Sequence, residues 1–229
     1  MMVVCLMTNV QSQKLRSITF TSGSIKDLAP EYEVVKIRGS VSIHQDVQLK
    51  RITSHGYSTF HSKVKVDHFQ NSGSCIMKSS CEAMDVVNAG NLKMYCGEVS
   101  KVTSSGRLAI ERTFMTEEFD SVGIIRAEEI QAKQFQLKLS GESKIVRLIA
   151  EEVSVEKDKI SFPLLKKILV CQDIKGKNIQ LSYTEADRVE GDIVVIGKHC
   201  KIHTLYYTES YSISPHAEVQ HIIRRENTW

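Results

Sequence analysis

The chain has 229 residues, 41% of them apolar and 25% charged, with a formal net charge of +3. These values exclude a disordered chain, which needs low hydrophobicity or high net charge, and the modest charge predicts no nucleic-acid partner. Val and Ile together number 44, whereas Ala and Leu number 23. Because β-branched residues favour strands and helix formers are scarce, we expect a mostly β protein.

The chain begins with an apolar run, residues 1–7 (MMVVCLM). The run is shorter than the roughly 18 residues of a membrane span, and it lacks the basic start and the small-residue cleavage site of a secretory signal. A short apolar end of this kind can touch a membrane surface or stay loose. We expect residues 1–22 to form a loose N-terminal segment.

The six cysteines form no C-x-x-C pair and no regular framework. Without a signal peptide, free thiols in a reducing compartment are the better interpretation. We therefore expect a cytoplasmic protein, which can also lie peripherally at the inner face of the cell membrane.

An internal repeat extends over most of the chain. Apolar residues recur 2, 8 and 13 positions after several glycines, as Val41, Val47 and Ile52 do after Gly39. Apolar pairs two residues apart indicate short strands with one buried face. Ten of the 12 glycines follow one another at a spacing near 17 residues, with one double step where a glycine is missing: Gly23, Gly39, Gly56, Gly73, Gly90, Gly106, Gly123, Gly141, Gly176 and Gly191.

Three short strands in each unit cannot bury their inner face alone. Stacked units can, because each strand then pairs in parallel with its equivalent about 4.8 Å along an axis. The pattern predicts an all-β fold, a single-stranded β-helix or β-solenoid with coils of about 17 residues over residues 23–156. The usual crossover preference favours a right-handed helix. A glycine at the same corner of each coil supplies a positive φ or the space that a Cβ would fill.

Residues 157–175 depart from the repeat. They contain Pro163, after which the spacing suits one short helix, so we expect an insertion at a coil corner, followed by C-terminal coils and a tail over residues 176–229. The insertion is basic and amphipathic. Its apolar face either packs against the solenoid, the common case, or lies on an anionic membrane surface. The membrane-surface candidates are Phe162, Leu164, Leu165, Lys166 and Lys167.

The sequence contains no constellation for catalysis. His199-Cys200-x-x-His203 has a spacing seen at metal sites, but a strand turns Cys200 to the face opposite both histidines, and no second cluster supports it. The aspartates share no position in the repeat, and neither a glycine-rich phosphate loop nor G-x-S-x-G is present. We expect no metal, no cofactor, no small-molecule substrate and no enzyme activity.

Two alternatives stay open beside a structural protein. One is a β-solenoid enzyme or carbohydrate-binding module, of the pectate-lyase or hexapeptide-acyltransferase type. Residues 195–202 (VIGKHCKI) look like one acyltransferase hexapeptide, although that fold needs many consecutive copies. The other is a membrane-surface adaptor.

Two stretches together resemble a known family. The first is the glycine ladder from Gly23 to Gly141, with unit ends such as residues 124–130 (IIRAEEI). The second is the tail, residues 186–202 (ADRVEGDIVVIGKHCKI), with Leu205-Tyr206-Tyr207 and residues 214–219 (SPHAEV) after it. Both look like the bactofilins, the polymer-forming cytoskeletal proteins of bacteria, and more narrowly like their longer Bacillus-type form, which has a similar insertion. The resemblance covers roughly residues 20–223, and the chain departs from it in its weak glycine pattern between 141 and 176 and in its apolar start.

The resemblance implies a right-handed β-helix that polymerises end to end, without nucleotide, into filaments. Such filaments scaffold cell-envelope, shape or motility functions, often at the membrane, so the implied partners are other copies of the chain and, beside them, the membrane surface or envelope and motility proteins. The open strand edges of a solenoid agree with self-assembly, because they must be capped or used, and a contact that does not close makes filaments. From their places at the two ends of the repeat, the interface candidates are Val34, Val35, Ile37, Val41 and Ile43 in the first coil and Ile193, Val195, Ile202, Tyr206 and Ile213 in the last.

Overall fold

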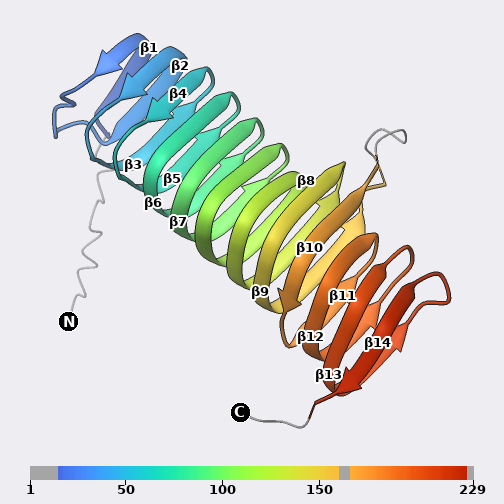
Figure 1. The fold of residues 1–229 in the computed structure, drawn as a ribbon. Helices are drawn as coiled ribbons and strands as arrows, with labels where there is room; N and C mark the ends of the chain where they lie inside the picture. Colours follow the sequence, from blue (N-terminus) through green and yellow to red (C-terminus); the bar gives the residue numbers. More distant parts are fainter. Residues whose placement is uncertain (1–14, 160–165, 226–229) are drawn as a thin grey trace, which may run out of the picture.

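The computed structural model describes residues 15–159 and 166–225. Within them every regular element is a β-strand, and the strands wind into one elongated right-handed β-helix of about 12 turns (Figure 1). The fold predicted from the sequence is confirmed. In chain order the strands are β1 Ser17–Ile25, β2 Val34–Ile43, β3 Val47–Ser54, β4 Tyr57–Phe60, β5 Val64–Asn71, β6 Ser74–Asn88, β7 Asn91–Ser104, β8 Arg107–Leu139, β9 Glu142–Lys157, β10 Ile168–Lys175, β11 Asn178–Leu181, β12 Thr184–Ile196, β13 Lys201–Ile213 and β14 Glu218–Arg224.

Each coil contributes one segment to each of three parallel sheets that run along the axis. We call these sheets face A, face B and face C, in the order in which a coil visits them. Their pairing is clear between two neighbouring coils: Tyr57–Phe60 with Ser74–Met77 on face A, Val64–Val66 with Cys81–Ala83 on face B, and His68–Asn71 with Asp85–Asn88 on face C. Consecutive segments often continue through a bend as one strand, which is why β8 is 33 residues long.

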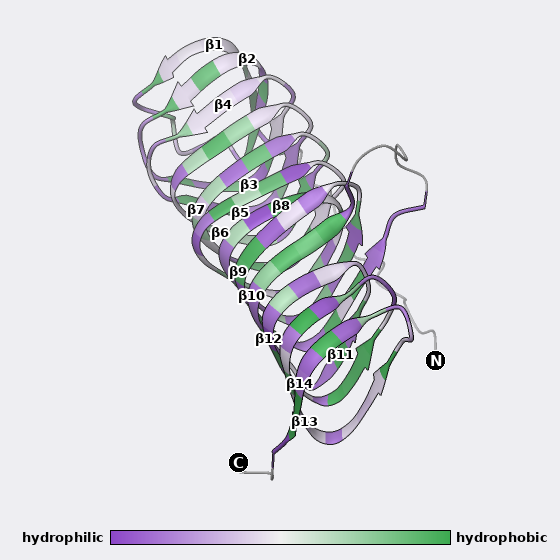
Figure 2. Ribbon diagram, turned by 45° about the vertical axis from the view of Figure 1, so that its right-hand side comes forward, coloured by the Kyte–Doolittle hydropathy of each residue, from purple (hydrophilic) through white to green (hydrophobic). Residues whose placement is uncertain are grey.

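Alternation of inward and outward side chains along each segment fills the space between the three sheets. In β5, Val64, Val66 and Phe69 are 0%, 3% and 1% exposed, while Lys65 between them faces solvent. Figure 2 shows the same alternation as changes of hydropathy along the strands. Burial of these side chains is the main stabilising term, because each Å² of apolar surface removed from water contributes about 25 cal/mol.

Aromatic side chains from neighbouring coils stack inside the solenoid. Phe119 lies on Phe135, one coil further along, with ring centroids 5.0 Å apart, and Phe114 meets Phe119 edge to face at 6.5 Å. A Cβ on Gly97 would lie 2.9 Å from Cε2 of Phe114. Gly97 therefore makes room for this ring, which explains why it falls outside the glycine repeat.

Six of the predicted corner glycines stack on one another where face C turns into face A. A Cβ on Gly73 would lie 2.1 Å from the carbonyl oxygen of Gly56, well inside van der Waals contact. The reason for glycine here is the close approach of successive coils, since Gly23 alone among the glycines has a positive φ, of 121°. The six are Gly39, Gly56, Gly73, Gly90, Gly106 and Gly123.

The prediction of one corner for all ten glycines is wrong for three of them. Gly23 lies within face A, where it pairs with Val41. Gly176 and Gly191 follow the segments of Lys175 and Glu190, which pair on face B, so both lie where face B turns into face C. The 35 residues from Gly141 to Gly176 are therefore not two coils with a missing glycine. They contain one complete coil, the insertion, and the face A and face B segments of the following coil.

Two predicted segment boundaries are also corrected. Residues 17–22 belong to β1, which stacks on β2 as part of the first coil, so the loose segment cannot extend to residue 22. Residues 168–175 form β10, which pairs with β9 and β12, so the insertion ends at residue 167 and not at 175. The helix predicted to begin at Pro163 lies outside the described residues, and residues 166 and 167 are not helical.

Candidate functional sites at the two ends and along an axial groove

The N-terminal end of the solenoid is an open strand edge. Within the described residues β1 has a backbone partner on one side only, which is β2. The side chains of Ile18 and Phe20 point inward but are half-buried. Their partners one coil further, Val35 and Ile37, are both 0% exposed. The first coil therefore presents apolar side chains that no described coil covers.

The interface residues predicted for this end are not at the end. All five are buried in the second coil, with exposed fractions between 0% and 7%, and β1 covers the edge of their strand. The sequence pattern of inward-facing apolar residues is the same in terminal and internal coils, so it does not mark the end of the solenoid. In addition, β1 (SITFTSGSI) has few apolar residues, and its sequence does not stand out as a coil. Ile18, Phe20 and Ile25 are the residues that sequence reasoning missed.

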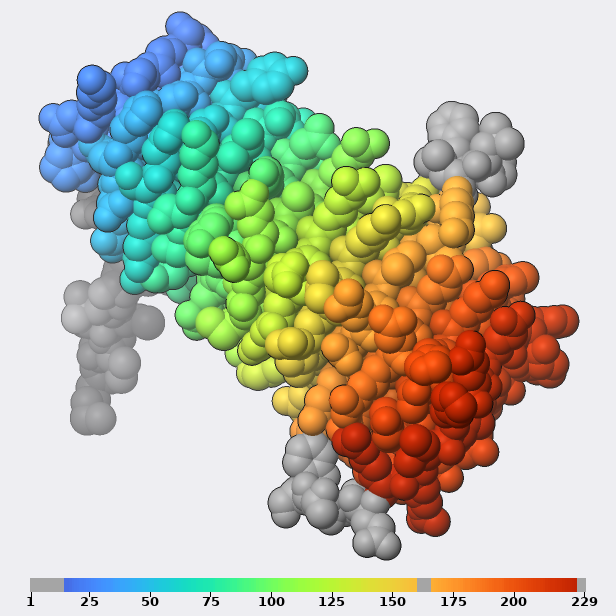
Figure 3. Space-filling view, viewed as in Figure 1, coloured from blue at the N-terminus to red at the C-terminus, as the bar shows by residue number. Residues whose placement is uncertain are grey.

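Among the residues that the structure describes, the C-terminal end is open on all three faces. There β14 pairs only with β13, and residues 210–213 of β13 pair only with β12. Ile222 is 42% exposed, whereas Leu205, its partner in the previous coil, is fully buried. Figure 3 shows this last coil as one end of the rod and β1 as the other.

Of the five C-terminal interface candidates, one lies at the open edge. Ile213 ends β13 and is half-buried. Ile202 is 2% exposed in the core, so its side chain is unavailable for an end-to-end contact. Ile193 and Val195 are 40% and 39% exposed, but they face outward from face C in an internal coil.

Tyr206, the fifth candidate, lies on face B in a cluster of charges. Glu190 pairs with Arg188 at 2.5 Å, with Arg225 at 2.9 Å and with Lys175 at 3.5 Å. The guanidinium carbons of Arg225 and Arg188 lie 4.2 and 5.0 Å from the ring centroid of Tyr206. Arg225 follows the last strand, so this cluster, which we call the Glu190 clasp, ties the end of the last coil to a coil two turns earlier.

The clasp changes the ionisation of Glu190. Partial burial raises its pKa, but the hydrogen bond from Arg188 and the charges of Lys175 and Arg225 outweigh this effect. The pKa of Glu190 therefore lies below its ordinary value.

The membrane-surface candidates are only partly within the described residues. Phe162, Leu164 and Leu165 lie outside them. Lys166 is exposed, but Lys167 is 6% exposed and its Nζ donates a 3.0 Å hydrogen bond to the carbonyl oxygen of Asp158. Lys167 therefore cannot present its charge to a lipid surface. No helix long and apolar enough to cross a membrane occurs in the described parts of the chain.

The thiols that the structure describes are mostly inward-facing. Burial raises the pKa of Cys75, Cys81 and Cys171 to about 12 in each case, so these groups stay protonated and unreactive near neutral pH. Around the His199 motif, the Cys200 thiol donates to the carbonyl oxygen of Leu181 at 3.5 Å, inside the solenoid. His203 faces outward, with Nδ1 2.6 Å from Oε1 of Gln220.

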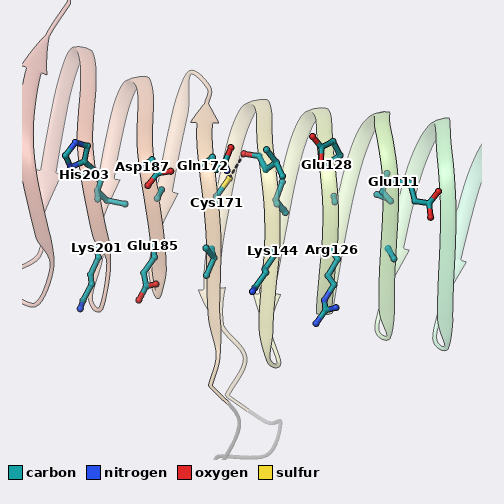
Figure 4. Close-up of a pocket in the computed structure, with 18 of the residues that line it drawn as sticks. Glu111, Arg126, Glu128, Lys144, Cys171, Gln172, Glu185, Asp187, Lys201 and His203 are labelled. Carbon is teal, nitrogen blue, oxygen red and sulfur yellow. Dashed lines mark hydrogen bonds between the residues drawn. The ribbon is translucent and has the colours of Figure 1, made fainter.

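A groove of about 1200 Å³ runs along the outside of the solenoid, where face A bends towards face B. Figure 4 shows two rows of side chains on successive coils. One row includes Arg126, Lys144, Glu185 and Lys201, and the other includes Glu128, Gln172, Asp187 and His203. The described residues contain no group of three or more His, Cys, Asp or Glu side chains placed to hold a metal ion. Sequence reasoning missed this groove, although the repeat contains a signal for it. Lys93, Arg126 and Lys144 each lie three positions after a repeat glycine, and Glu111 and Glu128 each lie five positions after one.

No family model matches the chain, and no solved structure matches it. A protein of Bacillus subtilis (strain 168) described as "uncharacterized protein YhbE" is 33% identical over 96 residues, which cover 40% of this chain and 40% of that protein. The chain thus spans 40% of the length of the curated relative that it matches. Because that relative carries no described function, the similarity assigns neither a family nor an activity.

Proposed function

We propose that the protein is a non-enzymatic scaffold of the bactofilin type, which assembles end to end into filaments without nucleotide. The observation that carries this proposal is the pair of uncapped ends: within the described residues, β1 and β14 each have a strand partner on one side only. Exposed strand edges beside apolar side chains are templates for pairing with another chain. A solenoid can satisfy both ends by stacking on further copies, which extends the same three sheets across the contact.

The sides of the solenoid differ from its two ends in the charge of their side chains. On the sides of the solenoid, charged residues of neighbouring coils pair with one another, as Lys101 does with Glu118 at 2.7 Å and Lys133 with Glu117 at 2.7 Å. Such solvated pairs keep a long β-surface soluble and discourage sheet-to-sheet association. The contrast between charged sides and apolar ends favours growth along the axis. Cell-envelope, shape or motility proteins and the inner face of the membrane are the partners that the family resemblance adds to the proposal.

Electron microscopy and analytical ultracentrifugation of the purified chain test the proposal. We expect filaments for the unmodified protein, and their loss in Phe20→Arg, which places a charge among the apolar side chains of the N-terminal end. Thr19→Arg is the matched control, because Thr19 is on the same strand but faces solvent. A wild-type protein that stays monomeric at high concentration, or filaments that form equally well from both variants, would refute the proposal.

A further inference from the structure

We propose that the axial groove binds an extended segment of another protein that carries acidic side chains along one edge and basic side chains along the other. The groove lies on the outer side of the solenoid. Its residues in the last coil, Glu218 and Gln220, are exposed on the outward side of β14, so this binding is separate from end-to-end assembly. The argument rests on the charges of the two walls, their pairing and the shape of the groove.

In the N-terminal half of the groove each wall carries like charges on neighbouring coils, whereas Glu185, Lys201 and Glu218 alternate in sign along the remainder of the first wall. Arg126 lies directly opposite Lys144 on adjacent strands of face A, and Glu111 and Glu128 line the groove one coil apart. Like charges that face each other across neighbouring strands are destabilising. Opposite charges are more common between coils elsewhere, as in the pair of Lys177 with Glu151 at 2.8 Å, although Glu82 lies opposite Glu98 on face B.

Two of these four charges have no ion-pair partner among the described residues. Glu111 pairs with Lys93 at 2.6 Å and Lys144 with Glu142 at 3.1 Å. Arg126 and Glu128 are exposed and make no ion pair within the described part of the chain. A basic wall faces an acidic wall at this level of the groove, and a ligand with both charges would satisfy the two walls together.

The shape of the groove suits an extended chain. Its lining runs from Lys93 to Glu218 across eight successive coils, a length of about 34 Å at about 4.8 Å per coil, which corresponds to about ten residues of extended polypeptide. Side chains of an extended segment point alternately to its two edges. A segment with alternating acidic and basic residues therefore presents one charge to each wall. Phe, Tyr and Trp are missing from the lining, so the groove has no stacking platform of the kind that sugars and bases use.

The test compares two labelled ten-residue peptides by fluorescence polarisation at low ionic strength. One peptide alternates Glu and Lys, and the other has the same composition with Glu and Lys grouped in two blocks. In an extended conformation only the alternating peptide separates its charges onto two edges. We expect it to bind at least about tenfold more tightly than the block peptide, and binding should weaken as salt is added.

The double variant R126E/E128K keeps the net charge of the protein but gives both walls mixed charges. It also places opposite charges against Lys144 and Glu111, so we expect its thermal stability to equal or exceed that of the wild type. Its affinity for the alternating peptide should fall at least about tenfold. The matched control is K101E/E118K, which exchanges the two charges of an existing ion pair outside the groove and should leave peptide binding unchanged.

Three results would overturn the proposal. The first is no difference between the two peptides, or no binding of the alternating peptide up to about 1 mM. The second is equal peptide affinity of R126E/E128K and the wild type. The third is a change in lateral self-association of R126E/E128K with peptide binding unaltered, which would show that the groove serves a second copy of this chain.

Discussion

The side-chain amide of Asn71 donates a 2.8 Å hydrogen bond to Oδ1 of Asn88, its equivalent one coil further along face C. Asn88 in turn donates to Oγ of Ser104 at 3.0 Å, in the next coil. All three side chains are buried, with exposed fractions of 0%, 1% and 2%. Because a buried amide is costly unless its partners are in place, this ladder stabilises one register of the coils over any other.

Replacement of Asn88 by alanine should destabilise the solenoid by about 1–3 kcal/mol, since it removes one of the acceptors of Asn71, the acceptor of the Gly90 N–H and the donor to Oγ of Ser104. Urea unfolding followed by circular dichroism measures the change. Asn91→Ala is the control, because the Asn91 side chain is exposed on face A, and its stability should differ little from the wild type. Equal losses in the two variants would contradict the role of the ladder.

Gly106→Ala should be among the most damaging single changes in the chain. Its Cβ would lie 2.1 Å from the carbonyl oxygen of Gly90, and two stacked backbones have no flexible side chain that could give way. We expect a loss of at least about 3 kcal/mol, against about 0.5 kcal/mol or less for the exposed neighbour in Ser105→Ala. Thermal unfolding of the two variants side by side checks this, and a wild-type melting temperature for Gly106→Ala would refute the steric explanation.

The Glu190 clasp should make the stability of the last coils depend on pH. Because the folded pKa of Glu190 lies below its ordinary value, its contribution is fully present above the unfolded pKa of about 4.3 and is lost as the pH falls through the lower, folded value. Glu190→Gln should therefore be less stable than the wild type at pH 7, and the difference should disappear below the folded pKa.

Hydrogen exchange at β13 and β14, measured at both pH values, locates the effect of the clasp. Glu98→Gln provides the control, since Glu98 is exposed and makes no ion pair within the described residues. A stability difference for Glu190→Gln that does not change with pH would contradict the electrostatic explanation.

Variants of the two ends should also reveal the polarity of assembly. Phe20→Arg blocks the N-terminal end and Ile213→Arg the C-terminal end, with Thr19→Arg and Ser212→Arg as controls on the outward side of the same strands. If unlike ends meet, each blocking variant alone should be monomeric, because every contact uses both ends. If like ends meet, each should stop at the dimer that its intact end forms. Sedimentation equilibrium separates the two cases, and unbroken filaments from both blocking variants would exclude these ends as the contacts.

The repeat itself was predictable because it follows from local chemistry. A period near 17 with apolar residues at constant offsets can bury its inner face only by stacking, so the β-helix followed from the periodicity of residues such as Val47 and Phe114. The end residues were not predictable in the same way. Val35 and Ile18 occupy equivalent inward positions, and their different exposure depends only on whether another coil lies beyond them.

The sequence by itself determined the coil length, the inward positions and the need for small residues at a corner, because each of these is set within one repeat. The tertiary structure decided which corner each glycine occupies, since the pairing of the strands places Gly176 and Gly191 after face B although the order of the faces is the same before and after the insertion. It also decided that Arg126 lies opposite Lys144 on the neighbouring strand, in the same wall of the groove, and that Arg225 pairs with Glu190 two coils earlier. These relationships join residues 18 and 35 positions apart, and only the stacking of the coils brings such residues to the same place on the surface.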